Sequence, residues 1–160
     1  MPITIRRATP ADIGAMVALV SAKRAQLEAF EPVTWHASKN APAMTEEFFR
    51  LQVAEQGPIF LVATDGPAVI GFINALLQPA PPVYDPGGKS IMIDDFAVVD
   101  GDIGDDAAMA LLDAAISEGR GRGAMQVIIV AAAKDERAAK WFRARQLHVF
   151  SNWWTCVLSH

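Results

Sequence analysis

The sequence contains a single cysteine, Cys156, among its 160 residues. One thiol excludes a disulfide within the chain and any cysteine-rich zinc site. Long hydrophobic runs are also missing, because the stretch 127–133 is among the longest, whereas a membrane span needs roughly 20 apolar residues. The first residues carry two arginines with no apolar stretch behind them, so we expect no signal peptide there. These absences predict a cytoplasmic protein that does not enter a membrane.

An excess of basic residues is missing as well. Fourteen Lys and Arg stand against eighteen Asp and Glu, which gives a net charge of −4. Proteins that bind nucleic acid usually carry a basic surplus for the phosphates, so we expect no nucleic-acid partner. A cationic small molecule suits the charge balance better. The 52% apolar content is enough for a substantial core, and the length predicts one domain over residues 1–160.

Hydrophobic periodicity predicts an alternation of strands and helices. Thr9, Pro10 and Asp12 are typical of a helix start, because they supply a cap, a favourable first residue and an acid near the positive end of the dipole. We predict strands at 3–6, 59–63, 69–77, 90–99 and 127–130, helices at 10–29, 44–55, 104–118 and 135–144, and a final strand or pair at 147–158. The order β-α-α-β-β-β-α-β-α-β predicts an α/β (α+β) fold, a mixed sheet with helices on its faces.

The segment 91–112 is the most informative part of the chain. It reads as a strand, a short glycine-containing loop and a helix, an arrangement that presents free backbone N–H groups to an anion. Its residues Asp95-Phe96-Ala97-Val98, then Gly104, then Ala110-Leu111-Leu112, resemble the GNAT superfamily of N-acetyltransferases. The run Asp135-Glu136-Arg137-Ala138, with Trp141-Phe142 behind it, is similar to the last helix of that family. More narrowly, Tyr84-Asp85-Pro86 with Asp94-Asp95-Phe96 is similar to diamine and polyamine acetyltransferases.

The resemblance implies transfer of an acetyl group from acetyl-CoA, as co-substrate, to a primary amine of a small molecule by direct attack. It implies Asp94 as the base that takes the proton of the ammonium, and a backbone N–H near Phe96 or Val98 that polarises the thioester carbonyl. Trp35 and His36 would line the acceptor pocket, or else pack on the surface. The residues implied in coenzyme binding are Phe96, Ala97, Val98, Ile103, Gly104, Asp105, Asp106, Ala107, Ala108, Asp135 and Phe142.

Two departures from the family pattern concern the chemistry. Ile103 and Asp106 stand where the family's loop usually has Arg or Gln and Gly, and the added carboxylates repel a pyrophosphate. Phe142 stands where a tyrosine usually protonates the leaving thiolate. Tyr84, the only tyrosine, is one hypothesis for that acid, and packing within its loop is the alternative. A second hypothesis for the whole chain is therefore a GNAT-like binding or interaction module that has lost its catalysis.

The remaining expectations concern pairs of neighbouring residues. Asp94 and Asp95 should point to opposite faces of their strand, one into the cleft and one under a helix; the alternative is charge pairing or turn capping near a strand bulge. Trp153 and Trp154 should divide between the core and an interface, which leaves a homodimer open. The aspartates at 100–106 lack the oxygen ligands of a calcium loop, so we expect no metal site.

Overall fold

A computed structural model describes residues 2–158 of the chain. Its strands are β1 (Thr4–Arg7), β2 (Ile59–Asp65), β3 (Ala68–Gln78), β4 (Lys89–Val98) and β5 (Ala124–Ile129). Its α-helices are α1 (Ile13–Phe30), α2 (Ala41–Ala54), α3 (Asp102–Gly121) and α4 (Glu136–Ala144), and a 3-10 turn at Pro10–Asp12 leads into α1. None of these helices has both the length and the apolar character that crossing a membrane requires.

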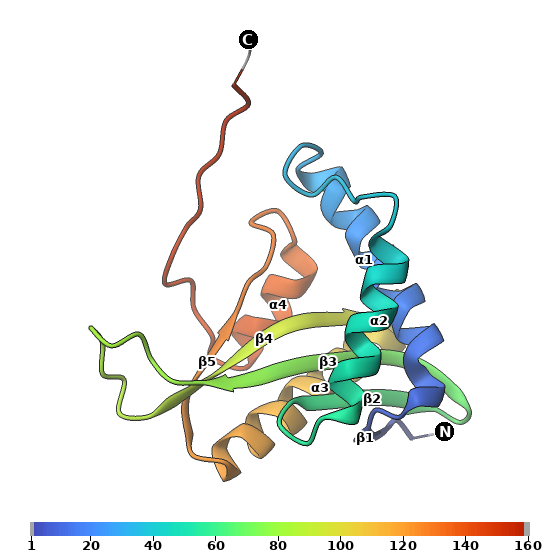
Figure 1. The fold of residues 1–160 in the computed structure, drawn as a ribbon, viewed down its shortest axis with the longest axis horizontal. Coiled ribbons are helices and arrows are strands. Elements are labelled where there is room, and N and C mark those ends of the chain that lie inside the picture. Colours follow the sequence, from blue (N-terminus) through green and yellow to red (C-terminus); the bar gives the residue numbers. More distant parts are fainter. Residues whose placement is uncertain (1, 159–160) are drawn as a thin grey trace.

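The five strands form one sheet in the order β1-β2-β3-β4-β5 (Figure 1). The first four strands pair antiparallel, whereas β5 lies parallel to β4, to which it is joined through α3. A parallel neighbour needs such a crossover, because the chain must return to the end of the sheet from which it left. The predicted mixed sheet is confirmed.

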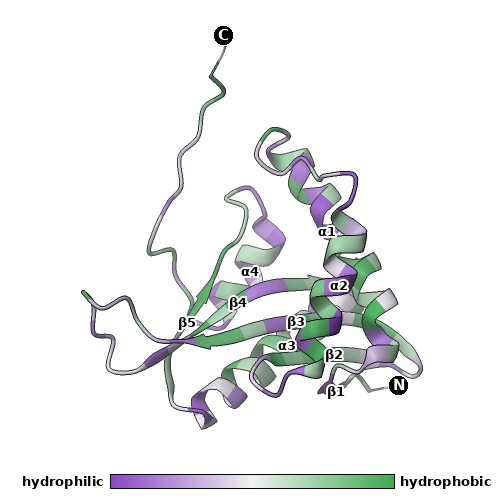
Figure 2. Cartoon of the chain, viewed as in Figure 1, coloured by the Kyte–Doolittle hydropathy of each residue, from purple (hydrophilic) through white to green (hydrophobic). Residues whose placement is uncertain are grey.

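Helices cover both faces of the sheet and divide the core in two (Figure 1). One core lies between the sheet and helices α1 and α2, and contains three phenylalanine rings whose centroids lie 5.3–6.1 Å apart: Phe49, Phe60 and Phe72. The other lies between the sheet and helices α3 and α4, and includes Leu111, Leu112 and Trp141. The hydrophobic colour in Figure 2 is concentrated on the strands, where both faces are covered.

The start of the first helix is built as its sequence predicts. Thr9 is the N-cap, and both its backbone N–H and its hydroxyl donate to the carboxylate of Asp12 over 2.8 Å. The Arg6 guanidinium donates two further hydrogen bonds of 2.8 Å to the same carboxylate. These hydrogen bonds, from Arg6 above all, lower the pKa of Asp12 to about 2, although its burial acts in the opposite direction.

The last predicted strand is absent from the structure. Residues 147–158 form no helix or strand and run away from the body of the molecule (Figure 1). The expectation that one tryptophan enters the core is wrong, because Trp153 is 94% and Trp154 92% exposed. At the end of α4, Gln146 adopts a φ of 62° and the Leu147 N–H donates to the Phe142 carbonyl. This turn leads the chain away from the sheet before it can pair.

Candidate active-site cleft

A cleft opens where β4 and β5 separate. Their pairing extends only to Ile93 opposite Ile129, whereas β4 continues to Val98 along β3. The cavity at this split has a volume of about 210 Å³ and is lined by residues of α1, β4, β5 and α4. Both cores of the protein thus border one opening in the sheet.

The free edge of β4 offers backbone donors to this cleft. The Val99 N–H donates to the Ile70 carbonyl on the β3 side, over 2.9 Å. Because successive N–H groups of a strand point to alternate sides, those of Val98 and Phe96 point away from β3, toward the split. This is the edge on which the sequence analysis places the donor to a thioester carbonyl.

A β-bulge shapes the same stretch of β4. Asn74 pairs with Asp95 and Ala75 with Ile93, so Asp94 has no partner on β3. The bulge interrupts the strand alternation, and both aspartates line the cleft. The prediction that only one of them meets the cleft is therefore wrong. Asp94 is exposed, whereas Asp95 is partly buried.

Asp95 is the unusual carboxyl of the pair. Its burial raises its pKa above the ordinary value, the Asp94 charge raises it further, and the Arg24 guanidinium acts in the opposite direction. A carboxyl with a raised pKa accepts a proton closer to neutral pH than an exposed one does. The family resemblance implies Asp94 for this role, whereas Asp95 has the more suitable surroundings.

The neighbour of Asp95 on β3 is a buried amide. Asn74 is completely buried, and within the described residues neither atom of its side-chain amide has a hydrogen-bond partner. An unsatisfied buried polar group costs about 1–3 kcal/mol. The sheet therefore accepts a cost in stability at this position, next to the carboxyl with a raised pKa, as functional sites often do.

An aromatic wall faces these polar groups. The Phe96 ring lies 5.8 Å from the Trp141 ring and 6.4 Å from the Phe142 ring, centroid to centroid. All three residues line the cleft. Phe142, which the family resemblance places beside the leaving group, has no hydroxyl to donate a proton.

The loop before α3 is held close to the end of β4. A side chain at Gly104 would place its Cβ 1.8 Å from the Val99 carbonyl oxygen, so this position requires glycine. Gly101, with φ of 87°, turns the chain into the helix. Ala107 and Ala108 are fully buried in the core, whereas Ile103 is 39% exposed and Asp106 faces solvent.

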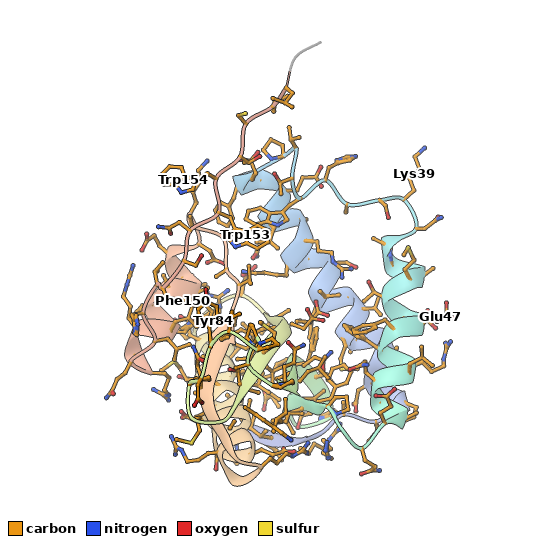
Figure 3. All side chains as sticks on the ribbon, turned by 60° about the vertical axis from the view of Figure 1, so that its left-hand side comes forward. Lys39, Glu47, Tyr84, Phe150, Trp153 and Trp154 are labelled. Atoms are coloured by element: carbon orange, nitrogen blue, oxygen red, sulfur yellow. The ribbon has the colours of Figure 1, made fainter. Side chains whose placement is uncertain are left out.

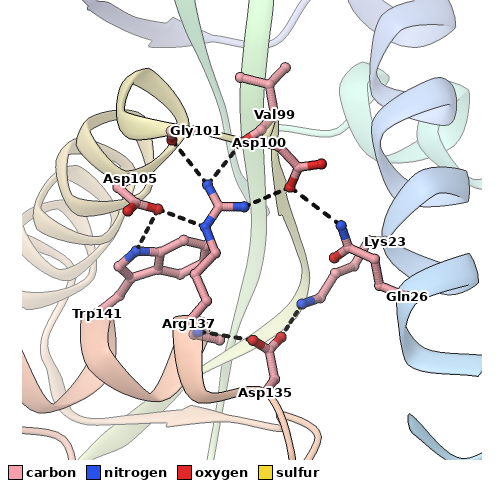
Figure 4. A network of polar contacts seen from close by, with 10 residues as sticks. Lys23, Gln26, Val99, Asp100, Gly101, Asp105, Asp135, Arg137 and Trp141 are labelled. Carbon is pink, nitrogen blue, oxygen red and sulfur yellow. Dashed lines mark hydrogen bonds and ion pairs between the residues drawn. The ribbon is translucent and has the colours of Figure 1, made fainter. Parts of the chain in front are cut away.

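Arg137 reaches from α4 to that loop (Figure 4). Its guanidinium donates to Asp105 over 2.7 Å and to Asp100 over 2.9 Å. It also donates to the carbonyls of Val99 and Gly101, at 3.1 and 3.2 Å. The Asp105 carboxylate thus turns toward α4, where its charge is neutralised, and does not project freely toward an incoming phosphate. Arg137 could not be identified as a site residue from the sequence, because no pattern links it to Asp105, 32 positions away.

Trp141 and Asp135 of the α4 region also hold this helix in place. The Trp141 indole donates to Asp105 over 3.2 Å, and the Arg137 guanidinium carbon lies 4.9 Å from the centre of the same ring. Asp135, proposed from sequence as a coenzyme contact, caps α4 through the Ala138 N–H and forms an ion pair with Lys23 of α1. Asp135 lines the cleft, but both its carboxylate oxygens have protein partners.

The structure separates the other predicted site residues. Trp35 lines the cleft, and it also lines a neighbouring cavity of about 320 Å³ together with His36. His36 lies 2.6 Å from Glu28, and this contact lowers the pKa of that carboxyl. Tyr84 is 72% exposed on the connection between β3 and β4, and it is not among the residues that line the cleft. Within residues 2–158, no group of three or more His, Cys, Asp and Glu side chains could hold a metal ion.

Solved structures with this architecture exist, although no family model and no curated protein matches the sequence. A mutant of a Bacillus halodurans protein superposes with a TM-score of 0.86 at 17% identity, over 98% of this chain and 99% of that one. A predicted acetyltransferase from Clostridium acetobutylicum, crystallised with acetyl-CoA, superposes with a TM-score of 0.71 at 16% identity, over 98% and 96%. Further matches are described as acetyltransferases. This chain has the GNAT fold.

Proteins of different description share this GNAT fold. A transcriptional regulator from Bacillus halodurans C-125 matches with a TM-score of 0.74 at 17% identity, over 98% of this chain and all of that one. At such identities the likeness establishes the GNAT architecture, with its split between β4 and β5. The activity of this chain has to be argued from its own residues.

Proposed function

We propose that the protein is an N-acetyltransferase that transfers the acetyl group of acetyl-CoA to a primary amine of a small molecule. The observation that carries the proposal is the carboxyl of raised pKa, Asp95, in a cleft beside the unpaired edge of β4. An amine acceptor needs a base, and a thioester needs a donor for its carbonyl oxygen. The cleft brings both groups together.

In this mechanism Asp95 takes one proton from the substrate ammonium, and the freed nitrogen attacks the thioester carbonyl carbon. The N–H groups of Phe96 and Val98 stabilise the oxyanion that forms. The carbon–sulfur bond then breaks and the nitrogen gives its second proton to solvent, which leaves a neutral amide and a thiolate. Because Phe142 has no proton to give, the thiolate is protonated by solvent, which a thiol of pKa about 8.5 permits. The exposed charge of Asp94 attracts the cationic substrate to the cleft.

Arg137 brings a guanidinium to a loop that has no basic residue of its own. Ile103 has no charge where the family resemblance implies Arg or Gln, and the Arg137 guanidinium lies at the same helix start. We propose that it contacts the pyrophosphate while Asp100 and Asp105 hold it in place. The rest of the site fits a coenzyme, since Gly104 allows the close approach of loop and strand and the edge of β4 is open.

The second candidate is a binding module without catalysis. The hydrogen bonds of Arg137 support this candidate, because its guanidinium already donates to two carboxylates and to two backbone carbonyls at the end of β4 and in the loop. If those bonds do not yield to a phosphate, the front of α3 stays blocked. Phe142 in place of a proton donor agrees with this reading.

Binding and turnover separate the two candidates. At 100 times its Kd, acetyl-CoA should add about 2.7 kcal/mol to the free energy of unfolding of the full chain. We therefore expect the melting temperature to rise. A panel of diamines, monoamines and amino acids, assayed by thiol release, should contain at least one acetylated acceptor. Binding without turnover on any amine would favour the second candidate, and no binding at millimolar coenzyme would refute the enzyme.

The role of Arg137 has a matched control on the same helix. Arg143 is 68% exposed at its side chain, and its ion-pair partner is Glu136, at 3.5 Å. We expect Arg137→Gln to weaken acetyl-CoA binding at least tenfold and Arg143→Gln to leave it unchanged. Arg137→Lys should recover part of the affinity, whereas a merely structural role would show as a lower melting temperature with the same Kd.

A further inference from the structure

Arg24 is a partly buried guanidinium that has no ion-pair partner within residues 2–158. It lies on α1, and its Nη1 donates to the hydroxyl of Thr45 on α2 over 2.6 Å. Its Nε and Nη2 donate to no acceptor in the described part of the chain. The adjacent Lys23, by contrast, forms an ion pair with Asp135. Because a guanidinium has five N–H donors, Arg24 keeps its charge and most of its donors available for a ligand.

Arg24 lies between two cavities that differ in charge. Together with Leu27 and Trp35, it lines both the cleft and the neighbouring cavity of about 320 Å³. Asp94 and Asp95 line the cleft, and the Arg24 charge is close enough to lower the pKa of Asp95. Among the described residues, no carboxylate lines the neighbouring cavity. A small molecule that extends from the cleft into this cavity therefore passes from acidic to basic surroundings.

The other polar groups of the neighbouring cavity also suit an anion. They are the hydroxyls of Thr34 and Ser38 and the ring of His36, all of which can donate hydrogen bonds. Glu28 contacts His36 at 2.6 Å but does not line the cavity. Apart from a protonated His36, the guanidinium of Arg24 is thus the only formal charge on the described lining of this cavity.

We propose that the acceptor is an amino carboxylate, whose carboxylate is bound by Arg24 in the neighbouring cavity while its amine lies at the aspartates of the cleft. The amine end of this inference rests on the proposed acetyl transfer. A guanidinium binds a carboxylate through two parallel hydrogen bonds, a geometry that the ammonium of a lysine does not offer. Leu27 and Trp35, which border both cavities, give a largely apolar path for the carbon atoms between the two charged ends.

Arg24 also acts against a diamine, the acceptor that the narrower sequence resemblance implies. The second ammonium of a diamine would lie in the neighbouring cavity beside the guanidinium, and two like charges repel. No carboxylate on the described lining of that cavity offsets the repulsion. One side chain therefore favours an amino carboxylate and disfavours the competing substrate class.

The first test compares acceptors on the wild-type chain with acetyl-CoA. Glycine, β-alanine, γ-aminobutyrate and the other natural α-amino acids are assayed by thiol release beside the amide of each acid and the diamine of the same length. We expect kcat/KM for at least one amino carboxylate to exceed that of its amide and its diamine at least tenfold, because both lack the anion that Arg24 binds. Equal or faster turnover of the amides or diamines would overturn the inference and leave the acetyl transfer standing.

The second test removes the guanidinium. In Arg24→Gln, the ratio of kcat/KM for the best amino carboxylate to that for its amide should fall at least tenfold. The ratio cancels the effect of Arg24 on Asp95, because both acceptors share it. Arg24→Lys should recover part of the preference, since it keeps the charge without the two parallel hydrogen bonds. A ratio that is unchanged in Arg24→Gln would contradict the assignment.

Lys39 provides the matched control for Arg24. It is exposed on the connection between α1 and α2, it lines neither cavity, and Figure 3 shows its side chain pointing away from the body of the protein. Lys39→Gln removes one positive charge, as Arg24→Gln does, and should leave the acceptor ratio within about twofold of the wild type because an exposed charge is screened. An equal loss in both variants would mean that general attraction, and not a contact of Arg24, selects the carboxylate.

The third test measures binding, so that this inference and the acetyl transfer can fail separately. Calorimetry with coenzyme A present, which has no acetyl group to give, should show binding of the preferred amino carboxylate that is at least tenfold weaker in Arg24→Gln. Selective binding without acetylation of any acceptor would support the amino carboxylate site and refute the proposed enzyme. An amino carboxylate panel in which none binds or reacts in preference to its amide would overturn the inference. The melting temperature of each variant checks that loss of the hydrogen bond to Thr45 leaves the chain folded, and the wild-type comparison needs no variant.

Discussion

Two aspartates in partly buried surroundings have opposite electrostatics in this protein. Asp12, before α1, accepts hydrogen bonds from Arg6 and Thr9, and its pKa is lowered to about 2. Asp95, in the bulge of β4, has burial and the Asp94 charge against its ionised form, and its pKa is raised. The neighbours of Asp12 stabilise its ionised form, whereas the surroundings of Asp95 favour its protonated form.

The difference separates a carboxylate that stabilises the fold from one that is suited to chemistry. A lowered pKa in the folded state adds stability above the unfolded value of 3.8, and this stability is lost as the pH falls toward about 2. A raised pKa has the opposite sign, because the folded state holds the proton more tightly and loses stability as the pH rises through that pKa. The same substitution, Asp to Asn, should therefore act oppositely at the two sites.

The largest effect should come from Asp95→Asn. Loss of a general base typically costs 10²–10⁴-fold, so we expect kcat to fall at least a hundredfold while acetyl-CoA still binds. The free energy of unfolding at pH 7 should stay the same or increase, because a neutral amide replaces a carboxylate disfavoured by burial. Kinetics and denaturant titration measure the two quantities.

Asp94→Asn is the matched control for that experiment. Its carboxylate is exposed, attracts the substrate and raises the pKa of Asp95. Its loss should therefore raise KM, shift the rise of kcat/KM with pH to lower pH, and leave kcat within a few-fold. A larger fall in kcat for Asp94→Asn than for Asp95→Asn would show that Asp94 is the general base, as expected from the sequence.

Asp12→Asn should act on stability alone. The lowered pKa corresponds to about 2 kcal/mol, and solvent around Arg6, whose side chain is 42% exposed, reduces the expected loss to about 1 kcal/mol at pH 7. The difference from wild type should close between pH 4 and pH 2, as the wild-type carboxylate takes up its proton. Urea titrations across this range measure it.

The exposed ion pair of Asp113 with Arg145 provides the comparison for Asp12. The Asp113 side chain is 55% exposed, and surface pairs contribute between 0 and about 1 kcal/mol. Asp113→Asn should therefore cost less than Asp12→Asn at pH 7. A loss for Asp12→Asn that persists unchanged at pH 2 would show that its cause is not the ionised carboxylate.

Arg24→Gln should move the pH dependence of catalysis. The Arg24 charge lowers the pKa of Asp95, so its removal raises that pKa further. The rise of kcat/KM with pH should then shift to higher pH, with little change on the alkaline side. Arg50→Gln, which removes an exposed charge paired with Glu46 on α2, should leave the profile in place. A profile that is the same in all three proteins would remove Asp95 as the titrating group.

Local signals in the sequence were enough for much of the fold. Thr9, Pro10 and Asp12 form the predicted helix start because capping depends on neighbours along the chain. The mixed sheet follows from the order of elements. The contact of Arg137 with Asp105 could not be predicted, since it joins two helices across 32 positions. A bulge near Asp94 and Asp95 was one of the two interpretations the sequence left open, but its position depends on the register with β3 and could not be fixed from β4 alone.

Residues 147–158 show where a local sequence pattern fails. Residues 147–158 have the composition of a strand, and the sequence predicted one. A strand also needs an edge to pair with, and the turn at Gln146 leads the segment away from its own sheet. Strand propensity reflects how well side chains pack on a sheet, so it does not predict whether a free sheet edge is within reach of the segment.

The smallest effect should come from Asp106→Asn, which tests the repulsion inferred from the sequence. Asp105 is neutralised by Arg137, whereas Asp106, like Asp102, forms no ion pair within residues 2–158. Because Asp106 faces solvent, counterions screen it, and the KM for acetyl-CoA should fall by less than about threefold. The gain should vanish at roughly 1 M salt, where screening acts over about 3 Å. Stability should drop by a few tenths of a kcal/mol, because an acid is lost from the first turns of a helix. A tenfold change in KM that survives high salt would mean that Asp106 turns inward when the coenzyme binds.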